Sequence, residues 1–165
     1  MKSRRMRCSR GFTLMEMMIV VVVIGIVAGL AVPSFLSYMP KLRVKAAARE
    51  IVSELRLARS KAVSERRPFG VAFNVGDNTL ISFADTDDPP SQVYSVSDSL
   101  LRADTLDGDI SLNSCTYANN CVVFNSTGAA STSGDLQIVT ADGSILMSIN
   151  ILASTGRVRL TEIGS

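Results

Sequence analysis

The chain begins with a long apolar block and continues with a stretch in which apolar residues recur at helical spacing. Residues 17–40 contain no charged side chain, and these 24 positions span about 36 Å as a helix at about 1.5 Å per residue. That length is enough to cross the hydrocarbon core of a bilayer. The pattern therefore predicts a membrane-spanning helix close to the amino terminus.

Residues 41–67 show an amphipathic helical pattern. Apolar residues recur at steps of three and four, which places them on one face of a helix that a folded domain can cover. They are Val44, Ala48, Ile51, Leu55, Ala58 and Ala62. Pro68 has no backbone N–H to donate and is expected to end the helix. A helix from Phe12 to Arg67 would have 56 residues and be roughly 80 Å long.

After Pro68 the pattern changes to short runs rich in β-branched and aromatic residues. FGVAFNV and TLISFA are separated by residues 76–78, GDN, which predict a β-hairpin. DLQIVT, SILMSINIL and RVRLT follow, with turns predicted at 142–143 and at 154–156. The fold class is therefore α+β, in which a long amino-terminal helix packs its second half against an antiparallel β-rich head.

The segment from Ala84 to Asn120 interrupts these runs. It is polar, contains two consecutive prolines and is expected to form an irregular surface loop. Asp85, Asp87 and Asp88 could supply oxygen ligands to calcium, but their spacing does not match an EF-hand loop. We therefore interpret them as a solvated acidic loop and predict no metal site.

Charge divides the chain into segments of opposite sign. The formal net charge is +2, but the residues before Phe12 carry +5, residues 41–67 carry +6 and residues 68–165 carry −8. Basic residues ahead of an apolar helix hold the amino terminus in the cytoplasm, which favours a head on the other side of the membrane. The basic stretch at 41–67 opposes that bias.

Two of the three cysteines lie close together in the head. Cys115 and Cys121 flank the polar segment TYANN. A head outside the cytoplasm would fold under oxidising conditions, where we expect these thiols to form a disulfide that contributes roughly 2–3 kcal/mol. Two reduced thiols in a cytosolic fold are the alternative. Cys8 precedes the apolar block and is expected to be removed with the leader sequence.

Glu16 is the only charged residue from Phe12 to Pro40. A carboxylate at the centre of a membrane helix costs roughly 2.5–3.5 kcal/mol, so an acid there usually has a partner. A cleaved secretory signal peptide fits the basic start and the small residues at 29–31, but Glu16 weakens its apolar region. A plain single-span anchor has a suitable length but leaves Glu16 unexplained.

Residues Gly11 to Glu16, GFTLME, resemble the cleavage and methylation motif of type IV pilins and pseudopilins. A basic leader, a glycine, a phenylalanine and a glutamate four residues after the cut coincide with an apolar run. The resemblance implies that the prepilin peptidase cuts after Gly11 and methylates the new amine of Phe12. It also implies that Glu16 pairs with the amino-terminal ammonium of a neighbouring subunit, which would relieve the burial of both charges. Pro33 corresponds to a proline of related pilins around which the helix loosens in filaments.

The head resembles the GspH/FimT branch of this family. The resemblance rests on LRLARSKAVSERRPFGVAF from residue 55, on GRVR at 156–159, and on Phe124, Gly128 and Gly134. It implies a type IV pilin fold that serves either a type II secretion filament or a type IV pilus, in which some FimT-like members take up DNA. The DNA contact would fall on Arg157 and Arg159, which share one face of a strand. The charge of −8 opposes this, so we favour pairing of both arginines with acids of the head.

The nine basic residues of 41–67 allow two interpretations. They form a solvated face near anionic lipid headgroups, or they match the charge of acidic heads in a filament, including heads like their own. The chain has no histidine, which excludes histidine-dependent triads and zinc sites. No motif marks other catalytic chemistry, so the sequence predicts neither an enzyme nor a cofactor.

The sequence therefore predicts a minor pilin-like filament subunit with a leader at 1–11, a transmembrane and filament-core helix at 12–40, an amphipathic helix at 41–67 and a periplasmic head at 68–165. Expected partners are other pilin or pseudopilin subunits, the prepilin peptidase, the inner-membrane assembly platform and membrane lipid; nucleic acid is less favoured. The expected location is the inner membrane, with a cytoplasmic amino terminus, and then a periplasmic or surface filament. Type II secretion is the favoured machine. A FimT/FimU-like minor pilin is the alternative, and an anchored receptor with an uncut leader is the third.

Overall fold

The computed structural model of the chain describes residues 11–87, 91 and 93–164. The predicted leader, apart from Gly11, lies outside the described residues, as do Cys8, Asp88 and the two consecutive prolines. The chain divides into two compact units, Met1–Met39 and Pro40–Ser165, and each is described by itself.

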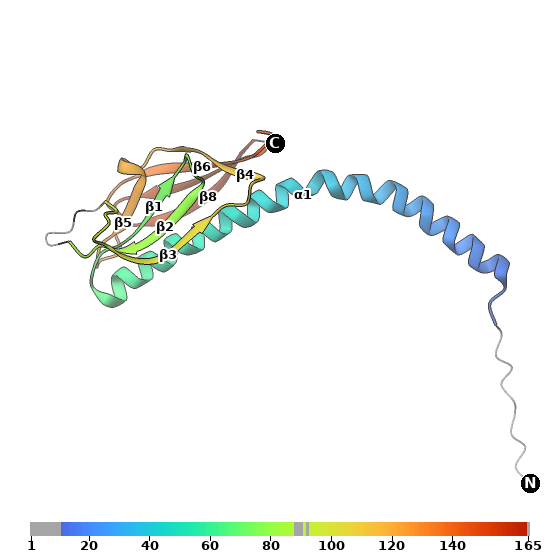
Figure 1. The fold of residues 1–165 in the computed structure, drawn as a ribbon, viewed down its shortest axis with the longest axis horizontal. Helices are drawn as coiled ribbons and strands as arrows, with labels where there is room; N and C mark the ends of the chain where they lie inside the picture. Colours follow the sequence, from blue (N-terminus) through green and yellow to red (C-terminus); the bar gives the residue numbers. More distant parts are fainter. Residues whose placement is uncertain (1–10, 88–90, 92, 165) are drawn as a thin grey trace, which may run out of the picture. The chain divides into compact units, whose positions relative to one another are not determined.

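One helix, α1 (Leu14–Glu65), accounts for both predicted helical segments (Figure 1). It begins after Thr13, whose hydroxyl accepts a hydrogen bond from the backbone N–H of Glu16 at 3.2 Å, as at the start of a capping box. It continues without interruption past Pro33. It ends two residues before the predicted end because Arg66 adopts a left-handed φ of 54°, which cannot continue a helix.

The described part of the first unit has an exposed apolar surface. Every side chain from residue 11 to residue 38 is exposed. In the described part of the chain α1 is the single helix that is long and apolar enough to cross a membrane. So much exposed apolar surface requires lipid or other helices as its environment.

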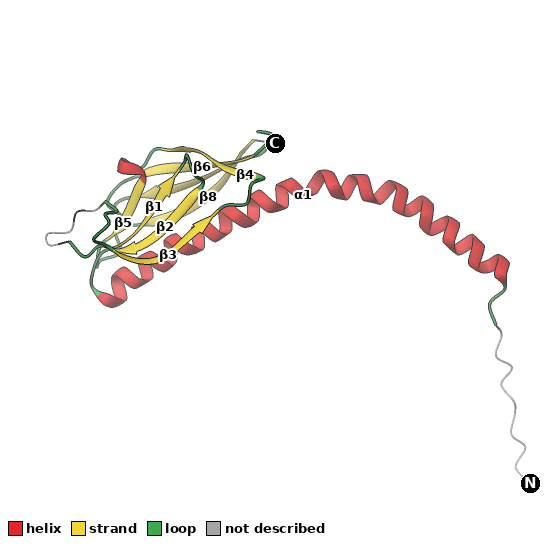
Figure 2. Cartoon of the chain, in the orientation of Figure 1, coloured by secondary structure: helices red, strands yellow, loops and turns green. Residues whose placement is uncertain are grey.

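The head contains two antiparallel four-stranded sheets (Figures 1 and 2). The first sheet has the order β3-β2-β1-β5, with strands β1 (Phe69–Asn74), β2 (Thr79–Ala84), β3 (Ser99–Thr105) and β5 (Cys121–Phe124). The second has the order β4-β6-β7-β8, with strands β4 (Ile110–Cys115), β6 (Gly134–Thr140), β7 (Leu146–Leu152) and β8 (Arg157–Gly164). A short 3-10 helix, η1 (Ala118–Asn120), precedes β5. The three turns predicted from the sequence join β1 to β2, β6 to β7 and β7 to β8, so these predictions are confirmed.

The prediction of an irregular loop from Ala84 to Asn120 is wrong, because this segment contains β3 and β4. Both are edge strands. Six of the seven side chains of β3 are exposed, so the strand shows no alternation of apolar and polar residues. In β4 only Ile110 and Leu112 are buried, and a register shift after Leu112 shortens the alternating pattern.

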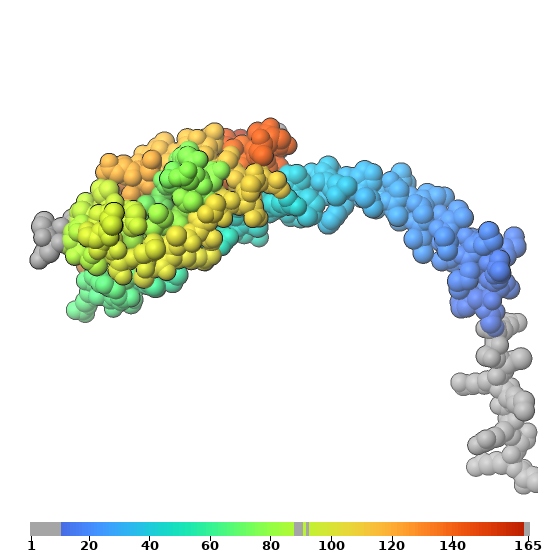
Figure 3. Space-filling model, viewed as in Figure 1, coloured from blue at the N-terminus to red at the C-terminus, as the bar shows by residue number. Residues whose placement is uncertain are grey.

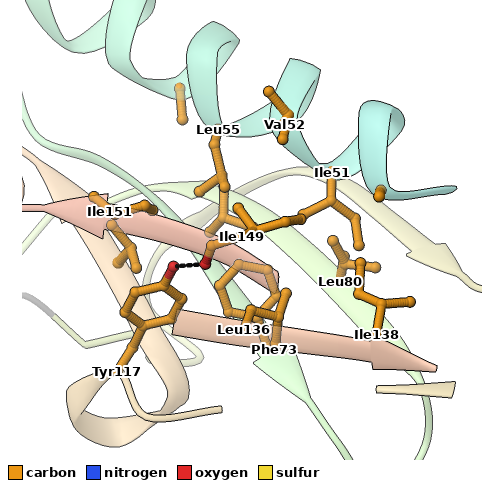
Figure 4. Packing of buried hydrophobic residues seen from close by; sticks show 14 of the residues in the cluster. Ile51, Val52, Leu55, Phe73, Leu80, Tyr117, Leu136, Ile138, Ile149 and Ile151 are labelled. Atoms are coloured by element: carbon orange, nitrogen blue, oxygen red, sulfur yellow. Dashed lines mark hydrogen bonds between the residues drawn. The ribbon is translucent and has the colours of Figure 1, made fainter. Parts of the chain in front are cut away.

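The predicted apolar stripe of α1 forms the centre of the core. All six of its members are at most 4% exposed, which confirms the prediction. Figure 4 shows Ile51 and Leu55 pointing from the helix toward the buried side chains of both sheets, among them Ile149 and Phe73. The Tyr117 hydroxyl donates to the Ile149 carbonyl at 2.8 Å, and burial raises the pKa of Tyr117. In Figure 3 the cyan-to-green part of α1 lies directly against the strands.

The β6–β7 turn depends on an ionised carboxylate. The Thr140 hydroxyl, the Ser144 backbone N–H and the Ser144 hydroxyl donate to Asp142 and lower its pKa to about 2. A pKa depressed by folding means that this stabilisation is complete above about pH 3.9, the usual aspartate value, and is lost as the pH falls toward 2. We expect the urea midpoint of the full chain in detergent micelles to fall more between pH 6 and pH 2.5 than that of Asp142→Asn.

Asp77→Asn, in the β1–β2 turn, is the matched control because it leaves Asp142 in place. It should lose as much stability in acid as the unsubstituted chain. Equal acid losses in Asp142→Asn and the unsubstituted chain would contradict a role for the Asp142 charge in this turn.

Candidate functional site

The amino-terminal motif is fully accessible in the structure. Phe12 is 73% exposed, and Glu16 is exposed in the first turn of α1. The carboxylate of Glu16 makes no hydrogen bond or ion pair within residues 11–87, 91 and 93–164, so its predicted partner is not in the described part of its own chain. Thr13 and Glu16 have the spacing of a capping box, a signal that was present in the sequence.

The apolar part of α1 also carries a surface for close helix approach. A Cβ atom added at Gly25 or at Gly29 would meet no heavy atom within 4 Å. The two glycines are four residues apart and therefore lie on the same side of the helix. Small residues at this spacing let two helices approach closely in lipid.

Only some of the basic residues in the second half of α1 form ion pairs with other described residues. Lys41 pairs with Glu162 at 2.6 Å, and Arg43 pairs with Asp109. Arg67 pairs with Glu65 at 2.8 Å. Lys45, Arg49 and Arg56 form no salt bridge or side-chain hydrogen bond with the described residues, and we call these three the basic flank.

Arg102 pairs with three acids next to another side of the helix, and the sequence did not predict this cluster. It lies 2.6 Å from Glu54 and 3.1 Å from Glu50, and it also pairs with Asp104. Asp104 and Glu54 raise the pKa of Arg102. The i,i+4 spacing of Glu50 and Glu54 was the available signal, but their partner on β3 is about fifty residues away.

These side chains line a groove between α1 and the strands. Its volume is about 460 Å³, and its apolar wall includes Ile51 and Leu80. Asp107 adds a fourth acid to the lining. We call the set Glu50, Glu54, Asp104 and Asp107, with Arg102, the acidic groove.

Arg157 and Arg159 are exposed on β8, at the edge of the second sheet. They stand opposite Leu152 and Asn150 of β7. The expected pairing with acids of the head is wrong, since neither arginine has an ion pair with any residue that the structure describes. Both side chains are exposed to solvent.

The structure holds Cys115 and Cys121 as free thiols. Cys121 is buried in a second cluster with Phe83 and Val123, whereas Cys115 is half-buried against the main core. Burial raises the pKa of Cys121 to about 12 and raises that of Cys115. A bridge would require the two side chains to leave different clusters, and the disulfide stays a prediction.

The acidic loop is not the solvated loop that the sequence suggested. Asp85 is 4% and Asp98 is 8% exposed. Oxygen atoms of Asp85, Asp87 and Asp98 lie within 4.8 Å of one another. Backbone or hydroxyl groups donate hydrogen bonds to all three, including the N–H groups of Thr86 and Ser95 to Asp98. We interpret the group as an internal cap of the loop, and Asp88 lies outside the described residues.

A glycine junction connects α1 to the second sheet. The Arg59 Nε–H donates to the Gly128 carbonyl at 2.9 Å. Gly128 and Gly156 have left-handed φ values of 81° and 60°, and Gly156 packs directly against the Gly128 carbonyl. The sequence marked both glycines through the family resemblance, but it gave no indication that Arg59 contacts them.

Comparison with sequence families gives two matches. The family described as type II transport protein GspH matches residues 47–156. The prokaryotic N-terminal methylation motif matches residues 6–32. A fimbrial protein of Pseudomonas aeruginosa is 43% identical over 60 residues, which cover 36% of this chain and 38% of that protein. The match to this curated relative therefore spans well under half of its length.

Solved structures share the fold. The minor pseudopilin EpsH from the type 2 secretion system of Vibrio cholerae is 21% identical, with a TM-score of 0.57 over 74% of this chain and 99% of that chain. The type IV minor pilin FimU of Pseudomonas aeruginosa is 20% identical, with a TM-score of 0.53 over 75% of this chain and 92% of that chain. At these identities the likeness shows the fold alone.

Proposed function

We propose that this chain, which belongs to the family of the type II transport protein GspH, is a minor pseudopilin that assembles through α1 into a type II secretion filament. Members of this family are structural proteins and not enzymes. The chain has the type IV pilin fold, in which a long helix packs against antiparallel sheets. In the proposed function the prepilin peptidase cuts after Gly11, and other pilin-like subunits surround the exposed helix.

The observation that carries the proposal is the coincidence of three features at the amino terminus. The methylation motif covers residues 6–32, the apolar helix that follows is uncovered, and Glu16 has no partner in the described part of the chain. A membrane supplies the apolar environment before assembly, and neighbouring subunits supply it afterwards. We infer an inner-membrane anchor with a cytoplasmic amino terminus and a periplasmic head, because five basic residues precede the span.

The test is the intact mass of the chain extracted from membranes that contain the prepilin peptidase. We expect a mature chain that begins at N-methylated Phe12. Gly11→Ala should leave the full-length mass, because the peptidase requires the residue at the cut. Gly29→Ala is the matched control and should still be processed. A full-length wild-type mass, or a cut after Ala31, would contradict the proposal.

A type IV pilus minor pilin is the second candidate function. It is favoured by the structural likeness to FimU, by the matched fimbrial protein and by the exposed Arg157 and Arg159. The test between the two functions is co-purification from a host that has both a type II secretion system and a type IV pilus. The major subunit that co-purifies with the chain shows to which of the two filaments the chain belongs. Salt-dependent DNA binding that disappears in Arg157→Ala/Arg159→Ala would favour the pilus.

A further inference from the structure

Three unpaired cations and two paired acids of α1 lie on different sides of the helix in the head. At about 100° per residue, Lys45, Arg49 and Arg56 fall within about 40° of one another around the helix. Glu50 and Glu54 lie about 140° away from them, measured around the exposed side. The buried stripe occupies the remaining sector and packs on the sheets. The basic flank carries cations alone. The side of Glu50 and Glu54 also carries Arg43 and Lys61, and it is acidic because Asp104 and Asp107 add two carboxylates to the groove there.

The acidic groove has more carboxylates than cations among the described residues that line it. One guanidinium, that of Arg102, is shared by Glu50, Glu54 and Asp104. Asp107 adds another carboxylate to the lining, and the other cation there, Arg43, is paired with an acid outside the groove. A cationic side chain of another molecule would complete this cluster.

The basic flank has the opposite excess, of positive charge. Lys45, Arg49 and Arg56 make no salt bridge with any described residue, although other cations of the same helix do. Glu162, which pairs with Lys41, also feels the charge of Lys45, so Arg49 and Arg56 are the less matched of the three. Each surface also has an apolar rim. Leu57 is 49% exposed near the acidic groove, and Val63 is 48% exposed in the sector of the basic flank. Contact between the two surfaces would therefore bury apolar area as well as pair charges.

We propose that the acidic groove receives the basic flank of a second copy of this chain. The proposal rests on the proposed function, because it describes how neighbouring heads meet in a filament. The two surfaces are different patches on opposite flanks of one helix, so the contact is heterologous. A contact of this type leaves a free groove on one copy and a free flank on the other, to which a further subunit can bind.

The test uses the full chain in lipid vesicles, prepared as isotopically light and heavy copies. A carbodiimide couples amines to carboxylates without a spacer, so heavy–light peptides report contacts between copies. We expect Lys45 of one copy to be joined to the groove acids of the other. Glu50→Lys/Asp107→Lys reverses charges of the acidic groove, and Arg49→Glu/Arg56→Glu reverses charges of the basic flank. Either double substitution should reduce heavy–light coupling between these surfaces by about tenfold, because like charges then face each other.

Mixing the two reversed variants should restore the coupling, since each then presents the charge that the other requires. Arg157→Glu/Arg159→Glu and Asp77→Lys/Asp135→Lys change charge equally at other sites and should leave coupling unchanged. Restoration also shows that both variants fold. Coupling that survives either reversal, or that does not return in the mixture, would overturn the proposal.

Intact mass is measured on the same samples. A chain with N-methylated Phe12 whose coupling does not depend on the two flanks would reject this inference while leaving the filament-subunit function in place. An unprocessed chain would reject the proposed function independently of the coupling result.

Discussion

Replacing Glu16 with glutamine is expected to exclude the chain from filaments while leaving it inserted in the membrane and processed at Gly11. Assembly would place the Phe12 ammonium of a neighbouring subunit in an apolar environment, where only a carboxylate neutralises it. Removing one member of a buried charge pair costs about 3–5 kcal/mol, which is a factor of about one hundred to a few thousand in association. Sedimentation of sheared filaments from membranes, with quantification of the chain in the pellet, measures the loss.

Glutamine is the informative substitution because it keeps the start of the helix intact. Glu16 is the third residue of α1, where glutamine fits a capping box with Thr13 as well as glutamate does. Glu65→Gln removes an acid from the same helix at an exposed ion pair and is expected to have little effect. Normal incorporation of Glu16→Gln, or an equal loss in Glu65→Gln, would contradict the assembly role of Glu16.

The helix and its buried face could be predicted because both depend on residues that are close together in the sequence. Val44 to Ala62 repeat at helical spacing, and every member of that stripe is in the core. The β1–β2 hairpin followed in the same way from a turn sequence between two β-rich runs. Patterns of this kind depend on neighbours within a few residues, which a single sequence contains.

The parts that were missed depend on distant residues. β3 is exposed almost throughout, so its pairing with β2 left no periodic signal in the sequence. The two cysteines are close in sequence, but they lie on strands of different sheets and pack into different clusters. The acidic groove forms only when β3 brings Arg102 to two acids of α1. For the candidate site, the sequence therefore predicted the amino-terminal motif but not the charged surfaces of the head.

Gly156→Ala is expected to destabilise the head by about 3 kcal/mol or more. An alanine at the left-handed φ of Gly156 costs roughly 1–2 kcal/mol by itself. In addition, its Cβ would collide with the Gly128 carbonyl, a backbone oxygen held in place by the Arg59 side chain. The turn and the loop would have to separate, and the contact between α1 and the second sheet would be strained with them.

Gly143→Ala separates the two causes of this loss. Gly143 also has a left-handed φ, 73°, but a Cβ there meets no heavy atom within 4 Å. It should therefore cost only the conformational term, about 1–2 kcal/mol. Urea unfolding of both variants as full chains in micelles measures the difference. Equal losses of unfolding free energy in Gly156→Ala and Gly143→Ala would mean that the Gly128 loop moves away from the new methyl group. Arg59 would then not fix that loop against the second sheet.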